Sequence, residues 1–273
     1  VHIIFWTIFV TILYTQVFYE PSLTSDWTLD QQILATSTVK VNGDITIRNV
    51  RNIDYKSTTD YTPQYYDTKL NVKDIVRAWF IVEPFGSFGA AHTFVSFELK
   101  NGKYISISAE IRKEKGEMFS PIRGLLNQYE LVYVIADEKD VLKLRTNYRK
   151  DRVYLYPIKS TPEKIQQVFL SMLERTNELA AEPEFYNTLT SNCTTNIARH
   201  ARQFSDKEIP WWDIRYLFPA TVDSLAYDVR LIDTELPLLE AREKFFITDI
   251  AQKNSENPDF SNVIRETLIF SDQ

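Results

Sequence analysis

Cys193 is the only cysteine in the 273-residue chain, and its sequence context favours a role as a nucleophile. Ser191 and Asn192 offer an N-cap for a helix that would begin at Cys193. The apolar face of that helix would be formed by Ile197, Ala198, Ala201 and Phe204. A thiol at the first helical position lies beside unpaired amides that favour the reactive thiolate. The alternative is a buried, inert cysteine that only fills the core. Such a cysteine does not need polar neighbours, whereas the residues from Thr190 to Asn196 surround Cys193 with hydroxyl and amide side chains.

A nucleophilic cysteine needs a base, and the chain has three histidines to supply it. His2 lies inside an apolar N-terminal segment. His200 follows Cys193 on the same predicted helix, roughly 10 Å further along the axis, and cannot reach the sulfur. His92 remains as the candidate base, and an imidazole satisfied at a strand edge is the alternative.

A third group normally orients the imidazole of such a pair. His92 lies on the first strand of a predicted hairpin that joins residues 92–100 to 103–111. With Asn101-Gly102 as a two-residue turn, His92 pairs with Ile111, and Glu110 or Ser108 approaches it from the returning strand. Glu110 as a solvated strand residue is the alternative.

Four more residues are candidates for binding substrate or supporting the site. Asn192 and Thr194 flank the thiol. Arg112 and Lys113 belong to a charged run that follows Glu110, which is either a solvated loop or a site for an anionic lipid head group.

The order of the predicted elements indicates the α+β class. Strand signals precede helical ones, and they fall at residues 38–41, 45–50, 78–82, 92–100, 103–111, 129–136 and 152–158. A short helix is predicted at 140–149 and a longer one after Thr161-Pro162. An antiparallel sheet packed against a helical layer follows from this order.

Composition limits the class of protein. With 44% hydrophobic and 25% charged residues, the chain can bury the core of one globular domain. The net charge of -6 excludes a basic nucleic-acid-binding surface. One cysteine can form neither an internal disulfide nor a structural zinc site.

The N-terminal residues 1–19 are almost entirely apolar or aromatic and carry no acidic or basic side chain. A membrane anchor with a truncated N-terminus is the expected role, and a signal-peptide core and a buried helix are the alternatives. Lys40 is the first basic residue after this segment, whereas Glu20 and Asp26 come earlier. By the positive-inside tendency, the body of the protein is expected outside the cytoplasm.

Three stretches resemble the periplasmic domain of Lnb-type bacterial lipoprotein N-acyltransferases. They are Ala91-His92-Thr93-Phe94, the run from Glu110 to Gly116, and the block from Glu184 to Asn196 that includes Asn-Cys-Thr-Thr-Asn. The resemblance extends from about Asp26 to Phe246 and is most specific in the last block.

The resemblance implies a permuted papain-like fold, similar to NlpC-type peptidases, in which a histidine strand precedes a helix that bears the cysteine. Together with the apolar N-terminus and the pattern of elements, it divides the chain into an anchor at 1–19, a connector at 20–36, a catalytic domain at 37–246 and a peripheral helical tail at 247–273. The implied mechanism passes a phospholipid acyl chain through a Cys193 thioester to a lipoprotein N-terminal amine, at the inner membrane, without a cofactor.

Two other classes of function remain open. One is a thiol hydrolase that cuts peptidoglycan amides or lipid esters, with water as acceptor. The other is a non-catalytic envelope binding module on the same scaffold.

Overall fold

The computed structural model describes residues 6–7, 20–86 and 89–269. The predicted anchor at 1–19 therefore lies outside the described residues, apart from Trp6 and Thr7. His2 lies outside them as well. Within the part of the chain that the structure describes, no helix has the length and apolar character needed to cross a membrane.

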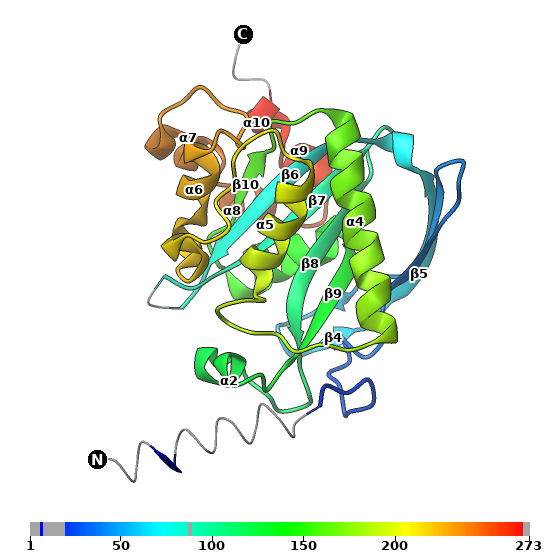
Figure 1. The fold of residues 1–273 in the computed structure, drawn as a ribbon. Coiled ribbons are helices and arrows are strands. Elements are labelled where there is room, and N and C mark those ends of the chain that lie inside the picture. Colours follow the sequence, from blue (N-terminus) through cyan, green and yellow to red (C-terminus); the bar gives the residue numbers. More distant parts are fainter. Residues whose placement is uncertain (1–5, 8–19, 87–88, 270–273) are drawn as a thin grey trace.

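The fold is α+β, as the sequence predicts, and its centre is a mostly antiparallel eight-stranded sheet (Figure 1). The strand order is β1-β2-β9-β8-β7-β6-β10, with β5 also paired to β2. The strands are β1 (Thr36–Val39), β2 (Asp44–Arg51), β5 (Tyr65–Asn71), β6 (Ile75–Pro84), β7 (Ala91–Leu99), β8 (Tyr104–Arg112), β9 (Glu130–Asp137) and β10 (Tyr154–Pro157). A separate small hairpin pairs β3 (Asp54–Tyr55) with β4 (Tyr61–Thr62).

Helices lie against this sheet and at one end of it. The long helices α4 (Pro162–Ala181) and α5 (Cys193–Phe204) pack on it side by side (Figure 1). The shorter helices are α2 (Pro121–Leu125), α3 (Glu138–Lys143), α6 (Val222–Asp228), α7 (Leu238–Lys244), α8 (Thr248–Lys253), α9 (Phe260–Val263) and α10 (Glu266–Ile269). Single turns are η1 (Val72–Asp74), η3 (Ile214–Tyr216) and η4 (Pro219–Thr221), and η2 (Leu144–Arg149) is a π-helical extension of α3.

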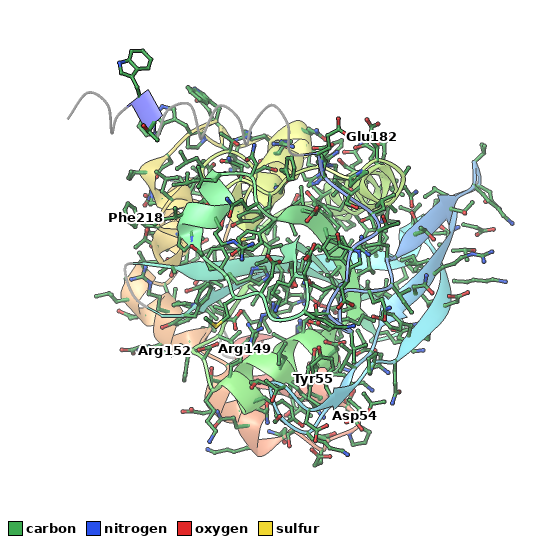
Figure 2. The ribbon with its side chains drawn as sticks, turned by 90° about the horizontal axis from the view of Figure 1, so that it is seen from below. Asp54, Tyr55, Arg149, Arg152, Glu182 and Phe218 are labelled. Carbon is green, nitrogen blue, oxygen red and sulfur yellow. The ribbon has the colours of Figure 1, made fainter. Side chains whose placement is uncertain are left out.

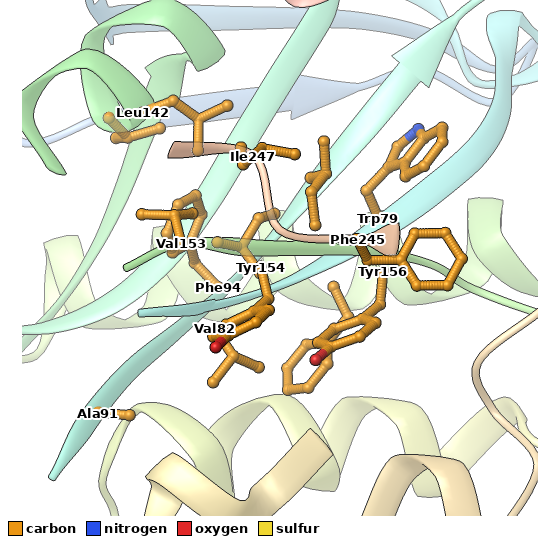
Figure 3. Close-up of a cluster of buried hydrophobic side chains, with 14 of the residues drawn as sticks. Trp79, Val82, Ala91, Phe94, Leu142, Val153, Tyr154, Tyr156, Phe245 and Ile247 are labelled. Atoms are coloured by element: carbon orange, nitrogen blue, oxygen red, sulfur yellow. The ribbon is translucent and has the colours of Figure 1, made fainter. Parts of the chain in front are cut away.

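Alternate residues of a strand point to opposite sides of the sheet. Both faces are buried, because a hydrophobic cluster packs on each of them. On β7, Val95 and Phe97 pack in the cluster that contains α4, where the Phe97 and Phe169 rings are 4.9 Å apart. Phe94 packs in the other cluster, with Trp79 and Phe245 (Figure 3). The central strands are therefore held rigidly from both sides.

The segment expected as a peripheral tail, 247–273, contributes to the core instead. Its described part forms α8, α9 and α10, and the fully buried residues Ala251, Phe260 and Ile264 belong to the cluster of Figure 3. The buried Arg265 also forms an ion pair with Glu138 of α3. The prediction followed the polar character of the segment and overlooked its few apolar residues at helical spacing.

The β7–β8 hairpin differs from the prediction by one residue. Leu99 N–H donates to Lys103 O at 2.8 Å, so the loop has three residues, Lys100-Asn101-Gly102, instead of two. Phe97 consequently pairs with Ile105 and Val95 with Ile107. Continued along the strands, this register places position 92 across from position 110 and not from 111.

Candidate active site

Helix α5 presents Cys193 at its first position, as the sequence predicts. Asn192 is the N-cap: its side chain accepts a hydrogen bond from Thr195 N–H at 2.9 Å and donates to Thr188 O at 2.8 Å. The backbone N–H of Cys193 is among the first amides of the helix, which have no intrahelical acceptor. The thiol is thus placed where a negative charge is favoured.

Strand β7 brings His92 to the thiol. His92 is the second residue of β7, and the Cys193 sulfur lies 4.0 Å from the carbonyl oxygen of the preceding Ala91. The imidazole and the thiol both line one cavity, and each group shifts the pKa of the other. The structure therefore brings together the two residues that the sequence singles out, although 101 positions separate them in the chain.

Ser108 and Glu110 on β8 occupy the other side of the imidazole. His92 Nε2 lies 2.7 Å from Ser108 Oγ and 3.5 Å from Glu110 Oε1, and Ser108 Oγ donates to Glu110 Oε1 at 2.9 Å. Because these contacts engage Nε2, Nδ1 is the ring nitrogen available to the thiol. The carboxylate thus fixes the orientation of the imidazole.

A buried arginine holds Glu110 in turn. Arg145 donates from Nη2 to Glu110 Oε1 at 3.3 Å and from Nε to Glu83 Oε2 at 2.6 Å. Gln31 Nε2 donates to Glu110 Oε2 at 3.3 Å. Arg145, Glu83 and Gln31 were not predicted from the sequence, because they come from distant segments of the chain. One signal could have indicated the ion pair: Glu83 lies inside the apolar strand β6, and Arg145 follows Val141, Leu142 and Leu144, so both charges were candidates for burial as a pair.

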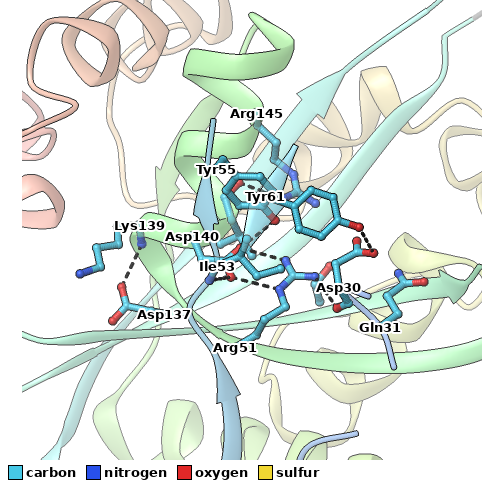
Figure 4. A network of polar contacts seen from close by, with 12 residues as sticks. Asp30, Gln31, Arg51, Ile53, Tyr55, Tyr61, Asp137, Lys139, Asp140 and Arg145 are labelled. Atoms are coloured by element: carbon cyan, nitrogen blue, oxygen red, sulfur yellow. Dashed lines mark hydrogen bonds and ion pairs between the residues drawn. The ribbon is translucent and has the colours of Figure 1, made fainter. Parts of the chain in front are cut away.

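A polar network secures the turn that carries Gln31 (Figure 4). Asp140 accepts hydrogen bonds from both Nε and Nη2 of Arg51, at 3.1 and 3.0 Å, and Arg51 Nη1 donates to Asp30 O at 3.3 Å. Tyr61 OH donates to Asp30 Oδ1 at 3.1 Å. The segment 20–36, expected as a connector, therefore packs on the body of the protein and takes part in supporting the site.

The charges of these groups shift their pKa values in a coordinated way. Burial alone raises the pKa of the Cys193 thiol, but the hydrogen bond and positive charge of His92 outweigh it, and the pKa falls to about 7. Burial alone lowers the pKa of His92, but hydrogen bonds to Cys193 and Glu110 raise it to about 9. Burial also opposes ionisation of Glu110, yet His92 and Arg145 hold its pKa well below the usual range. Between about pH 7 and 9 the site thus contains a thiolate beside an imidazolium.

The reactive groups open into one cavity of about 730 Å³, here called the site cavity. Its lining includes Cys193, His92, Glu110 and Asn192, and Lys113 is also part of its wall. Its other walls are mainly aromatic and aliphatic, made by Phe85, Phe119, Tyr186, Leu217, Phe218 and Pro219. A cavity of this size and composition is typical of a site for a small amphipathic ligand.

Two of the predicted binding residues lie elsewhere. Arg112 is buried, donates to the carbonyl oxygens of Gln31 and Gln32 at 3.1 Å each, and stacks over Trp27. It supports the segment around Gln31 and does not line the site cavity, because its guanidinium is bound to the backbone of that segment. Thr194 hydrogen-bonds to Thr93 at 3.0 Å and faces a second cavity.

His200 contacts groups away from the thiol and has a structural role. Its ring contacts Tyr133 OH at 3.0 Å and Ser171 Oγ at 2.8 Å. Burial, with a smaller effect from the charges of Arg199 and Arg175, lowers its pKa to about 4. This histidine is neutral at physiological pH and serves the packing of α4 against α5.

Replacing Glu110 with glutamine is expected to lower the His92 pKa by about one unit or more, because the imidazolium loses its carboxylate partner. The thiol pKa rises in consequence. An NMR titration of the His92 ring protons measures the shift. Glu98→Gln, on the same hairpin but bonded to Trp79, is the control and leaves the titration unchanged. An unaltered His92 titration in Glu110→Gln would show that the carboxylate does not act on the imidazole.

Comparison with known proteins gives one family. A family model described as the Lnb N-terminal periplasmic domain matches residues 61–220, more than half of the chain. The match includes His92, Glu110 and Cys193. Neither the curated proteins nor the solved structures contain a match.

Proposed function

Because the chain belongs to the family of the Lnb N-terminal periplasmic domain, we propose that it is a thiol-dependent acyltransferase of the bacterial envelope. The observation that supports this most is that Cys193 shares the wall of a large cavity with an imidazole oriented by Ser108 and Glu110. A histidine strand that precedes a cysteine helix also suits the permuted papain-like arrangement.

The first step is attack of the Cys193 thiolate on the carbonyl carbon of a phospholipid acyl ester. The S–C bond forms, the C–O bond to glycerol breaks, and the His92 imidazolium gives its proton to the departing alkoxide. The backbone N–H of Cys193, at the start of α5, is available to stabilise the negatively charged oxygen of the intermediate.

The second step transfers the acyl group to the α-amine of a lipoprotein's N-terminal cysteine. The amine nitrogen attacks the thioester carbonyl, and the neutral His92 takes the proton that the nitrogen loses. The C–N bond forms and the C–S bond breaks, which restores the thiolate and imidazolium. With water in place of the amine, the same site would be a hydrolase.

Exposed apolar side chains around the site cavity favour a lipid as the acyl donor. They come from two segments, 118–125 and 211–218, together with Leu189, and we call them the apolar rim. Its members are Met118, Phe119, Ile122, Leu125, Leu189, Trp211, Trp212, Ile214, Leu217 and Phe218. Trp211 is 80% exposed and Trp212 61%, and Phe218 lies at the periphery of the molecule (Figure 2). Such a patch beside a cleft is typical of a surface that contacts a membrane or another apolar partner.

The charged groups of the site cavity suit the head group of the same donor. Lys113 and Arg149 both line the cavity, and the side chain of Arg149 is 39% exposed (Figure 2). We propose that these two cations hold the phosphate while the ester carbonyl lies at Cys193. The inner membrane is the expected source of the lipid, with the apolar segment 1–19 as the anchor.

Replacing both Trp211 and Trp212 with serine is expected to reduce the rate with vesicle phospholipid about tenfold or more, because the rim loses its largest apolar groups. The rate with soluble p-nitrophenyl butyrate should stay unchanged, since the site itself is intact. Leu239→Ser removes an equally exposed apolar residue from α7 and serves as the control. Equal losses with both substrates, or none with vesicles, would contradict membrane docking by the rim.

The proposed function is tested by incubating the full chain with vesicles of acyl-labelled phospholipid and analysing it by intact-protein mass spectrometry. A hydroxylamine-sensitive acyl adduct on Cys193 is the expected result. An added peptide with an N-terminal S-diacylglyceryl cysteine should then become N-acylated. Free fatty acid without acylated peptide would support the hydrolase instead. A chain that forms no adduct and releases no product would be a binding module.

A further inference from the structure

A second cavity, here called the inner cavity, lies between the sheet, α5 and α6. Its volume is about 120 Å³. Its lining is almost entirely apolar and includes Val95 and Phe97 of β7, Ile197, Ala198 and Ala201 of α5, and Leu225 of α6. The inner cavity is only partly enclosed, because Ala201, Phe204 and Ser205 of its lining are half-buried. An apolar pocket of this kind accepts apolar molecules.

The inner cavity reaches the immediate neighbourhood of the nucleophile. Thr194 lines it, and Thr194 Oγ1 lies 3.8 Å from the Cys193 sulfur. Tyr216 lines both the inner cavity and the site cavity. These two side chains therefore mark where the inner cavity adjoins the thiol, and a chain attached to the sulfur would enter the inner cavity there.

The dimensions of the inner cavity suit a single hydrocarbon chain. This volume is slightly below the roughly 150 Å³ of an apolar cavity that binds benzene, so the enclosed part of the inner cavity accommodates about five methylene groups. Helix α5 continues from Cys193 to Phe204, which is about 16 Å at 1.5 Å per residue, and Phe204 and Ser205 line the cavity at that end. The small side chains of Ala198 and Ala201 leave this path open.

We propose that the inner cavity binds the acyl chain of the Cys193 thioester, so that the chain runs along α5 between the sheet and α6. This inference rests on the proposed function and adds a specificity determinant to it: the cavity selects the length of the acyl chain. The acyl carbonyl stays at the wall of the site cavity, where the acceptor amine reaches it. Each methylene that enters the cavity from water favours binding about fourfold.

The experiment compares the rate of Cys193 acylation by p-nitrophenyl esters of butyric, decanoic and palmitic acid. Wild type is expected to react faster with the decanoyl ester than with the butyryl ester. Ala201→Phe from α5 and Ala226→Phe from α6 each fill the inner cavity. Both should reduce the decanoyl rate about tenfold or more and leave the butyryl rate unchanged. Ala180→Phe, at a half-buried position of α4 outside the inner cavity, is the matched control.

Two results would overturn the inference in different ways. If both phenylalanine variants react with the decanoyl and butyryl esters at the wild-type rates, the acyl chain lies elsewhere. The proposed function would then still stand. Absence of an adduct from every ester in the wild-type chain would remove the proposed function and the inference with it.

Discussion

Replacing Cys193 with serine is expected to reduce the rate of acyl transfer by on the order of 10³-fold or more. The reason is that a serine hydroxyl beside His92 is not ionised near neutral pH, whereas the thiol has a pKa of about 7. The measurement is the initial rate of peptide N-acylation with vesicle phospholipid as donor.

Thermal unfolding provides the control for this substitution. Cys193 is 6% exposed at a cavity wall, and exchange of sulfur for oxygen leaves the packing of α5 nearly unchanged. Cys193→Ala removes the nucleophile altogether and should be equally inactive. Transfer activity that persists in the folded alanine variant would exclude a Cys193 thioester.

Replacing His92 with glutamine is expected to reduce the same rate by about 10²- to 10⁴-fold, the usual contribution of a general acid–base group. The variant loses both the base and the positive charge that stabilises the thiolate, and burial remains, so the thiol pKa should rise above about 8.5. Measurement of the rate at several pH values separates the two losses, since higher pH restores the thiolate but not the proton transfer.

His200→Gln is the matched control, because His200 is the other described histidine and is buried on α5 itself. It contacts Tyr133 and Ser171, away from the site cavity. Its replacement should lower the thermal midpoint and leave the rate per folded molecule unchanged. An equal loss of activity in both variants would indicate that His92 acts through folding alone.

The local signals around Cys193 were sufficient to predict its position. Asn192 caps α5 as predicted, and a cap acts through residues within one turn, so the sequence window contains it. His92 was identified by excluding the other histidines, without any information about the distance to Cys193. The meeting of the two depends on long-range packing of β7 against α5, which no local pattern encodes.

The hairpin register shows how small differences in a turn affect a site. A two-residue turn would pair His92 with Ile111 and direct Glu110 to the opposite face of the sheet. The three-residue loop closed by Gly102, with φ +75°, shifts the register by one and puts Ser108 and Glu110 on the same face as His92. Glu110 was thus proposed from a register that was wrong, and its contact with His92 depends on the extra loop residue.

The parts that sequence did not predict are those whose stability comes from tertiary contacts. Strand β5 has mostly polar, half-exposed residues without apolar alternation, and it exists because β2 provides a partner edge. Arg145 and Glu83 carry charges that are acceptable in the interior only because the fold pairs them. Residues 247–269 similarly become core because α3 and β10 pack against them.

The alkylation rate of Cys193 by iodoacetamide as a function of pH tests the central claim most directly, because the chain has a single cysteine. A thiolate stabilised by His92 predicts a midpoint near pH 7 in the wild type, and a midpoint above about 8.5 in His92→Gln. The same midpoint in both proteins, at or above about 8.5, would mean that the imidazole does not activate the thiol, and would contradict the proposed chemistry.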